Sequence, residues 1–379
     1  MTTVGRLIDE ARYLASVVAA SADRIERKRR IPGDVIQPII DAGFFRLLLP
    51  RSLGGFELTH PDFLQIVRIF AESDASMAWC INQNNVFSTN ASRLPEEGAI
   101  KVWSNPETVV AAGTPIPGSG ATAIPDGFRI TGRWDFCSGI AHSNWVSARA
   151  VVATEDAESG RPRDFLMPKE AIEEIDQWYV GGLKGTGSFS FVANDVVVDP
   201  QMSCCPTDPP RENGPLYLID TTPLFASGFA NVALAASRAG LDFAIKLANR
   251  KMQQGANHVL SADQATHRSI GQAEAQWNAS RAFLDEATQT MWYEATEHRE
   301  LPISTRIKVR LASTHAIRTA AEIANSAYAL CGSSAIFSAN PIQRHFQDVH
   351  AITQQIQGRQ THYDTAGQFY LGMEPKGIF

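Results

Sequence analysis

The stretch GRWDFCSGIAHSNWV, residues 132–146, is the densest candidate site in the chain. Side chains alternate between the two faces of a strand, so Trp134, Phe136 and Ser138 are expected on one face. Gly139 then allows the backbone to turn. Aromatic rings and one hydroxyl on a single face suit a flat ring system with one polar edge. The same pattern is also typical of a core strand with aromatic packing, and a lone histidine after a turn, such as His142, is more often structural than catalytic.

Strand-like segments surround this stretch, and helical segments lie on both sides of them. Residues 128–134, 145–153 and 187–199 alternate or run in β-branched and aromatic residues between Gly, Pro and Asp. Proline and glycine break the pattern from residue 113. The sequence therefore predicts a mainly α protein with a central β-domain. We expect three domains: an N-terminal α-helical domain over 1–113, a middle β-domain over 114–221 and a C-terminal helical bundle over 222–379.

Composition excludes several classes of protein. The chain has 379 residues, a formal net charge of −6 and five cysteines. Mild acidity argues against a nucleic-acid-binding protein. The sequence has no apolar run of 18 residues, so no membrane span is expected. The scattered, odd-numbered cysteines suit a reducing cytoplasm. No zinc-type spacing, Walker loop, dinucleotide fingerprint or hydrolase elbow is present, so no metal site is expected.

Two further segments are candidate sites. Residues 71–85, AESDASMAWCINQNN, are predicted as one helix that carries Trp79 and a cluster of amides: Asn82, Gln83, Asn84 and Asn85. The amides either line a substrate pocket or mark a frayed, exposed helix end. The segment GTGS, residues 185–188, is either a tight turn or a place where the backbone approaches a planar ligand.

The last helix is expected to begin near Pro341 and to carry one stripe of side chains, namely Arg344, Asp348, Ala351, Ile352 and Gln355. Arg344 and Asp348 are four residues apart and are spaced to form an ion pair. Packing at an oligomer interface is the simpler interpretation of this stripe.

Taken together, these segments resemble the acyl-CoA dehydrogenase superfamily. The resemblance covers nearly the whole chain and rests on five segments in the right order: residues 30–55, 71–79, 127–145, 185–199 and 331–355. It implies an N-terminal α-domain, a middle β-barrel-like domain and a C-terminal four-helix bundle. It also implies a homotetramer that holds flavin between subunits.

The segment HAITQQIQ, residues 350–357, distinguishes two branches of that superfamily. Medium-chain acyl-CoA dehydrogenases carry Tyr-Glu-Gly-Thr-x-Gln-Ile-Gln here, and their glutamate removes the α-proton of the thioester. This chain has Ala351 at that place, and alanine cannot act as a general base. The W-x-F-x-S-G pattern and the GTGS turn instead resemble the oxygenase components of two-component flavin monooxygenases, which include 4-hydroxyphenylacetate hydroxylases, dibenzothiophene monooxygenase and sugar N-oxygenases.

This second resemblance implies reduced FMN or FAD supplied by a separate NAD(P)H-dependent reductase, with O₂ as cosubstrate. A C4a-hydroperoxyflavin would hydroxylate, or oxygenate at nitrogen or sulfur, a small aromatic or heteroaromatic substrate. Ser138 matches the serine at flavin N5, and Trp134 and Phe136 would shield the ring. The remaining implied cofactor contacts are Gly139, Thr186, Ser188, Gly332, Arg344 and Asp348.

The chain departs from the oxygenase pattern at two places. Gln347 precedes Asp348 where many relatives have arginine, and Gln355 stands where many have a histidine near C4a. A neutral amide donates and accepts hydrogen bonds but does not shuttle protons at pH 7. Either the substrate needs little deprotonation, or the neighbouring His350 takes the role of the missing histidine, so the expected catalytic residues are Ser138, Gln355 and His350. The expected substrate pocket is formed by Trp79, Asn82, Asn85 and His142. Two alternatives stay open: a flavin desaturase or oxidase of the dehydrogenase type, and a catalytically silent flavin-binding oligomer.

Overall fold

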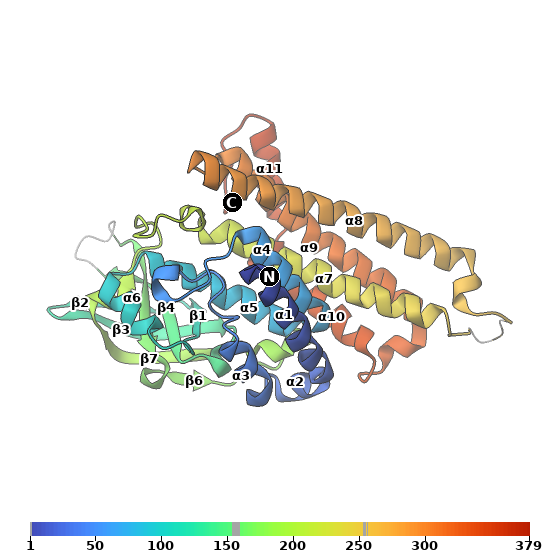
Figure 1. Ribbon diagram of the computed structural model, residues 1–379, viewed down its shortest axis with the longest axis horizontal. Coiled ribbons are helices and arrows are strands. Elements are labelled where there is room, and N and C mark those ends of the chain that lie inside the picture. The colour runs from blue at the N-terminus through green and yellow to red at the C-terminus, as the bar shows by residue number, and fades with distance from the viewer. Residues whose placement is uncertain (1, 154–159, 253–254, 256) are drawn as a thin grey trace.

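The computed structural model describes residues 2–153, 160–252, 255 and 257–379. A twisted sheet lies at one end of the molecule, and long helices extend from it to the other end (Figure 1). Helices of the N-terminal part pack where the sheet and the long helices meet. These are α1 (Thr3–Ala20), α2 (Ala22–Lys28), α3 (Gly33–Asp41), α4 (His60–Ser73), α5 (Ala75–Ser88) and α6 (Glu96–Trp103).

The prediction of one helix through residues 71–85 is wrong. Helix α4 ends at Ser73, and Asp74 has extended backbone with φ −157°. The Asp74 side chain accepts a hydrogen bond from the backbone N–H of Met77 at 2.9 Å and so caps α5. This break sets the direction of α5, whose side chains reach the sheet.

The central sheet follows the order β6-β7-β3-β1-β4-β5-β8, and β2 pairs with both β3 and β4. Its strands are β1 (Val110–Pro115), β2 (Gly120–Ile124), β3 (Gly127–Cys137), β4 (Trp145–Ala153), β5 (Pro162–Pro168), β6 (Glu173–Ile175), β7 (Phe189–Val198) and β8 (Ser203–Cys204). Strand β3, which leads into the densest candidate site, pairs along its length with β7 in antiparallel register.

The prediction that Trp134 and Phe136 share a face is wrong. The register of β3 against β7 shifts between Trp134 and Cys137, and Phe136 has φ +59°. A bulge of this kind breaks the alternation of side chains. Trp134 is 0% exposed and stacks on Phe191 with ring centroids 5.2 Å apart, whereas Phe136 is 62% exposed. Trp134 therefore belongs to the core of the sheet domain and offers no surface to a ligand, in contrast to its expected role as a shield.

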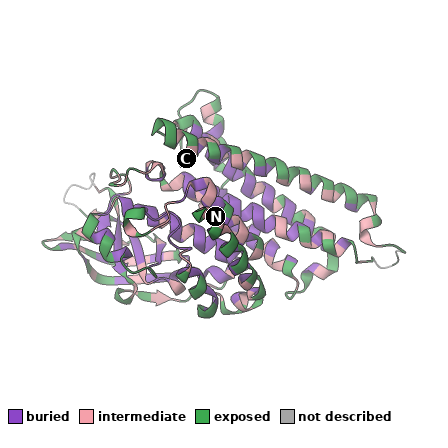
Figure 2. Cartoon of the chain, in the orientation of Figure 1, coloured by how far each residue is buried: buried purple, intermediate pink, exposed green. Residues whose placement is uncertain are grey.

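The C-terminal part is a bundle whose most extensive helix–helix contact is between α7 and α9. Its helices are α7 (Thr221–Ala248), α8 (Gln264–Tyr293), α9 (Ile303–Cys331), α10 (Pro341–Thr353) and α11 (Thr361–Tyr370). Among the described residues, α7 is the one helix long and apolar enough to cross a membrane, but 83% of its apolar window is buried inside the protein. It is the central helix of the bundle, while α8 presents a long exposed face (Figure 2).

Candidate functional site

A chain of buried hydroxyl groups joins α5, the end of β3 and the start of β7. The indole N–H of Trp79 donates to the Ser138 hydroxyl at 3.0 Å. Ser138 and Ser188 lie 2.8 Å apart, and Ser188 and Thr186 lie 2.7 Å apart. The structure thus brings together Trp79, Ser138, Thr186 and Ser188, four residues that the sequence proposed from three separate segments.

The direction of this hydrogen-bond chain is fixed at both ends. The Thr186 hydroxyl donates to the carbonyl of Leu183 at 2.8 Å, because a carbonyl only accepts. Ser188 must then donate to Thr186, and Ser138 must donate to Ser188, since each hydroxyl has one proton. Trp79 supplies a donor to Ser138. The Ser138 oxygen is therefore left with one free lone pair, and towards a ligand it is a hydrogen-bond acceptor.

The backbone around Gly139 holds this arrangement in place. Gly139 has φ +81°, and its N–H donates to the carbonyl of Thr186 at 2.9 Å. A side chain at this position would clash with Asn84 and His142, so the turn requires glycine. Burial lowers the pKa of His142 to about 3, and its Nε2 has no hydrogen-bond partner within the described residues. His142 is neutral at pH 7 and is a poor base.

The three asparagines of the amide cluster are buried and Gln83 is partly buried, so a frayed and exposed helix end is excluded. The Asn85 side chain is bonded to four backbone groups. Its oxygen accepts from the N–H of Leu47 at 2.7 Å and of Leu48 at 3.3 Å. Its nitrogen donates to the carbonyls of Phe44 and Ile81, both at 2.8 Å. The expectation that Asn85 lines a substrate pocket is therefore wrong, because all its polar atoms are used by backbone groups.

Asn82 differs from Asn85, because neither of its amide atoms has a partner within the described residues. It packs against Gly228 of α7, where a Cβ would lie 1.9 Å from the Asn82 oxygen. Beside it, the ring of Trp79 stacks on Phe229 with centroids 3.8 Å apart. Phe229 could not be predicted as a site residue, because nothing in the sequence distinguishes this phenylalanine from the other apolar residues of α7.

The C-terminal stripe is divided by the end of a helix. Helix α10 begins at Pro341, as predicted, but ends at Thr353. Gln355 precedes a short turn, η11 (Ile356–Gly358), and its side-chain oxygen accepts from the N–H of Gln357 at 2.7 Å. The extension of the stripe to Gln355 is therefore wrong. His350 hydrogen-bonds Asn325 of α9 at 2.9 Å, apart from the hydroxyl chain.

Arg344 and Asp348 do not form the expected ion pair. Arg344 lies 3.9 Å from Asp23, and the Asp348 carboxylate accepts from the N–H of Leu183 at 2.6 Å. Asp348 thus ties α10 to the turn that carries Thr186 and Ser188. Gly332 lies elsewhere, at the end of α9 near Lys251, so the structure separates it from the hydroxyl chain.

Asp348→Asn is expected to weaken the loss of stability at alkaline pH. Burial, followed by the negative charges of Glu26 and Asp74, raises the pKa of Asp348 from 3.8 to about 8. Stability linked to the protonated carboxyl is fully present below about pH 4 and is lost as pH rises towards 8. The asparagine keeps the oxygen that accepts from Leu183 and does not titrate. Between pH 6 and 9 the Tm of Asp348→Asn should fall less than the Tm of the wild type. Equal falls would contradict the raised pKa of Asp348.

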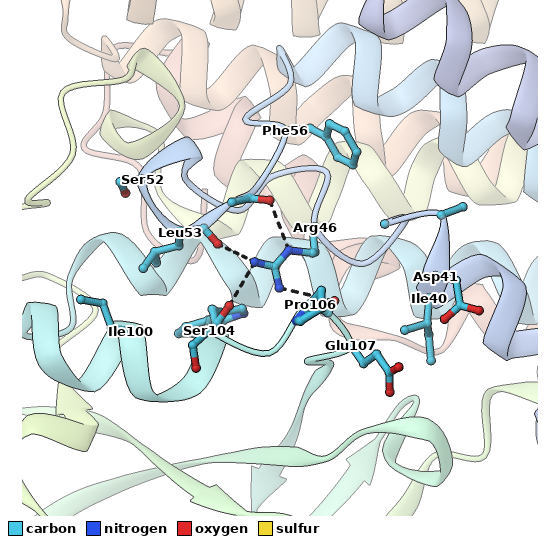
Figure 3. Close-up of a pocket in the computed structure, with 14 residues that line it drawn as sticks. Ile40, Asp41, Arg46, Ser52, Leu53, Phe56, Ile100, Ser104, Pro106 and Glu107 are labelled. Carbon is cyan, nitrogen blue, oxygen red and sulfur yellow. Dashed lines mark hydrogen bonds between the residues drawn. The ribbon is translucent and has the colours of Figure 1, made fainter.

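A separate cavity of about 580 Å³ lies beside α3 and α6. Figure 3 shows Arg46 on its wall, with its guanidinium directed at backbone carbonyls. Arg46 donates to the carbonyls of Leu53, Gly54, Trp103, Asn105 and Pro106. Every N–H group of this side chain donates to a backbone carbonyl. Arg46 therefore stabilises the surrounding loops and has no N–H group left to bind a ligand.

Comparison with known proteins identifies the family. Residues 6–94 match the acyl-CoA dehydrogenase N-terminal domain, and residues 227–359 match the acyl-CoA dehydrogenase C-terminal domain. The chain is 28% identical to the indole-3-acetate monooxygenase of Pseudomonas putida, over 94% of this chain and 91% of that protein. It is 24% identical to the oxygenase component of the FADH₂-dependent resorcinol hydroxylase of Rhizobium sp. strain MTP-10005, over 99% and 96% of the two chains.

The solved structure of XiaF from Streptomyces sp., in complex with FADH₂ and glycerol, has the same fold. It superposes with a TM-score of 0.92 at 20% identity, over 99% of this chain and 98% of that chain. The predicted fold class is confirmed: N-terminal helices, a central sheet and a C-terminal helical bundle of the acyl-CoA dehydrogenase type. The chain belongs to the acyl-CoA dehydrogenase superfamily, in its branch of flavin-dependent monooxygenases.

Proposed function

We propose that this protein is the oxygenase component of a two-component flavin monooxygenase, which uses reduced flavin and O₂ to oxygenate a small aromatic or heteroaromatic compound. The single observation that carries the proposal is the polarised chain Trp79–Ser138–Ser188–Thr186 at the place where the resemblance puts the flavin. No carboxylate stands at position 351, so the dehydrogenase-type alternative lacks its base there.

The residues at this place fit a flavin. Ser138 keeps one acceptor position, Gly139 forms the turn beside it, and the exposed ring of Phe136 packs edge-on to Trp178 with centroids 6.2 Å apart. Phe136 would cover the ring system, and Thr186 and Ser188 would hold Ser138 in position. When bound, reduced flavin supplies the electrons that activate O₂ and transfer one oxygen atom to the substrate.

The polarity of the hydroxyl chain selects the redox state of the cofactor. Reduced flavin carries an N–H at N5, whereas the oxidised ring has an unprotonated nitrogen there. A Ser138 oxygen that accepts but does not donate would hydrogen-bond the reduced form and not the oxidised form. This is the requirement for a component that receives reduced flavin from a separate reductase.

Ser188→Ala should narrow the preference for reduced flavin. Without Ser188, the Ser138 proton is free to point at N5 and to hydrogen-bond the oxidised ring. One hydrogen bond contributes about 1 kcal/mol. The Kd for oxidised flavin divided by the Kd for reduced flavin should therefore fall about fivefold. Anaerobic titration with reduced flavin and aerobic titration with oxidised flavin measure this ratio.

Ser190→Ala is the matched control, because Ser190 is buried on the same strand but donates to Asp135 at 2.6 Å. Its ratio should equal that of the wild type. A Ser188→Ala variant that binds flavin with an unchanged ratio would contradict the polarity argument.

Aromatic side chains and neutral groups support an aromatic substrate. Trp79, Phe229 and Phe225 form a stacked row beside Asn82, whose amide has no partner among the described residues. The relatives named above act on indole-3-acetate and on resorcinol. A homotetramer in the cytoplasm, served by a separate NAD(P)H-dependent flavin reductase, completes the proposal. Exposed apolar side chains near the C-terminus support the oligomer, among them Tyr370, Leu371 and Met373.

A further inference from the structure

Three arginines are buried in the described part of the chain, and they differ in how their charges are compensated. They are Arg46, Arg281 and Arg310. Arg46 donates to backbone carbonyls only (Figure 3). Arg281 donates through Nε and Nη2 to the two carboxylate oxygens of Asp285, and through Nη1 to Asn231. Arg310 is the most buried of the three, at 1% exposure.

Arg310 has neither kind of compensation. Its Nη1 donates to the side-chain oxygen of Gln357, while Nε and Nη2 have no partner within the described residues. One turn further along α9, on the same face, the buried hydroxyl of Ser313 also lacks a partner in that part of the chain. A buried cation without an anion is strongly unfavourable, so such a group is normally paired.

The unpaired edge has the shape that binds a carboxylate. Nε and Nη2 present two parallel N–H groups, which match the two oxygens of a carboxylate. Two described arginines use the same edge on both oxygens of a carboxylate: Arg149 holds Asp164 with both distances 2.8 Å, and Arg281 holds Asp285. In Arg310 this edge is available for an anion from outside the described chain.

Contacts through the turn after α10 link Arg310 to Gln355 and to α7. Gln357, its partner, lies in the turn after α10, and Gln357 is held in turn by Gln355. The resemblance places Gln355 near the reacting part of the flavin. The same turn packs against α7, the helix that carries Phe229. The His362 ring N–H donates to the carbonyl of Ile356 at 2.7 Å. Burial lowers the pKa of His362 and so favours the neutral ring, which does not compensate the charge of Arg310.

We propose that Arg310, assisted by Ser313 and Gln357, binds the carboxylate of the substrate, and that the substrate class is small aromatic acids. This inference rests on the proposed function, because it places an acid at the site of oxygenation. The edge is enclosed in this structure, so entry of the acid requires the turn of residues 356–358 to move. Hydroxylation of the ring needs no contact between Arg310 and the reacting atoms.

Isothermal titration of the flavin-free protein tests this assignment. The probes are indole-3-acetate, phenylacetate and benzoate, each compared with its neutral amide of the same shape. At least one acid should bind about tenfold more tightly than its amide, and Arg310→Met should abolish that difference. If every acid binds the wild type no better than its amide, or if Arg310→Met keeps the difference, the proposal is overturned.

The stability of the variants separates recognition from a structural role. Arg310→Met removes an uncompensated buried charge, so the Tm of the ligand-free protein should rise. Arg281→Met, the matched control, removes a paired arginine and should lower the Tm while keeping the preference for acids. A Tm of Arg310→Met that falls as in Arg281→Met would make Arg310 structural and overturn the proposal.

Two further measurements distinguish failure of acid binding at Arg310 from failure of the proposed oxygenase function. If phosphate or chloride stabilises the wild type as much as the best aromatic acid does, the edge is a simple anion site and the substrate class is wrong. Flavin titration of the same Arg310→Met protein reports separately on the proposed function. A retained preference for reduced flavin alongside a failed acid preference would overturn only the inference about Arg310.

Discussion

Ser138→Ala is expected to convert most of the reducing equivalents into hydrogen peroxide instead of oxygenated product. With reduced flavin bound, the Ser138 oxygen would accept a hydrogen bond from N5–H and so hold that proton, which favours oxygen transfer over peroxide formation. Loss of one such hydrogen bond, worth about 1.4 kcal/mol, should lower the ratio of product to peroxide about tenfold. Flavin should still bind, because the ring contacts of Phe136 and the backbone of Gly139 remain.

The measurement compares product and peroxide per NADH consumed, with a general flavin reductase and an aromatic substrate. Ser143→Ala is the matched control: Ser143 is buried in the same loop, and its hydroxyl donates to the carbonyl of Ile140 at 3.1 Å. Its coupling should equal that of the wild type. Unchanged coupling in Ser138→Ala would remove Ser138 from its assigned role.

Asn85→Ala should cause a large loss of stability, while Asn82→Ala should change stability little. Truncation of Asn85 leaves two buried N–H groups and two buried carbonyls of the backbone without their partner. Each such group costs about 1–3 kcal/mol, so a loss of at least about 3 kcal/mol is expected after relaxation. Asn82 is equally buried on the same helix, but its amide has no partner within the described residues.

Urea denaturation of the two variants measures this difference directly. Asn82→Ala should stay within about 1 kcal/mol of the wild type, because the cost of its small cavity is offset by removal of an unsatisfied amide. Equal losses of unfolding free energy in the two variants would show that the hydrogen bonds of Asn85 to the backbone do not stabilise the fold.

The order of helices and strands could be predicted from the sequence, because hydrophobic periodicity and the Pro/Gly breaks report on it directly. The contacts between Trp79, Ser138 and Ser188 could be anticipated only through the family resemblance. Residue spacing carries no information on which loops meet. The donor–acceptor order in the hydroxyl chain, and hence the acceptor character of Ser138, follows from the contact between Thr186 and the carbonyl of Leu183. That contact is visible only in the structure.

The errors have local physical causes. The bulge at Phe136 turns this side chain away from the face of Trp134, and a strand pattern does not reveal a positive φ. Asp74 ends one helix and caps the next, which a continuous apolar pattern conceals. Arg310 was not singled out, because its burial follows from the packing of α9 against its neighbours and not from its own residue type.

The central claim is that this chain transfers one atom of O₂ to an aromatic substrate with electrons from reduced flavin. The most direct measurement uses ¹⁸O₂, NADH, a general flavin reductase, FMN or FAD, and the aromatic compounds named above, with mass spectrometry of the products. The expected product carries one ¹⁸O atom, and its formation depends on both the reductase and this chain. A desaturated product, an unlabelled product, or hydrogen peroxide as the sole product of O₂ would contradict it.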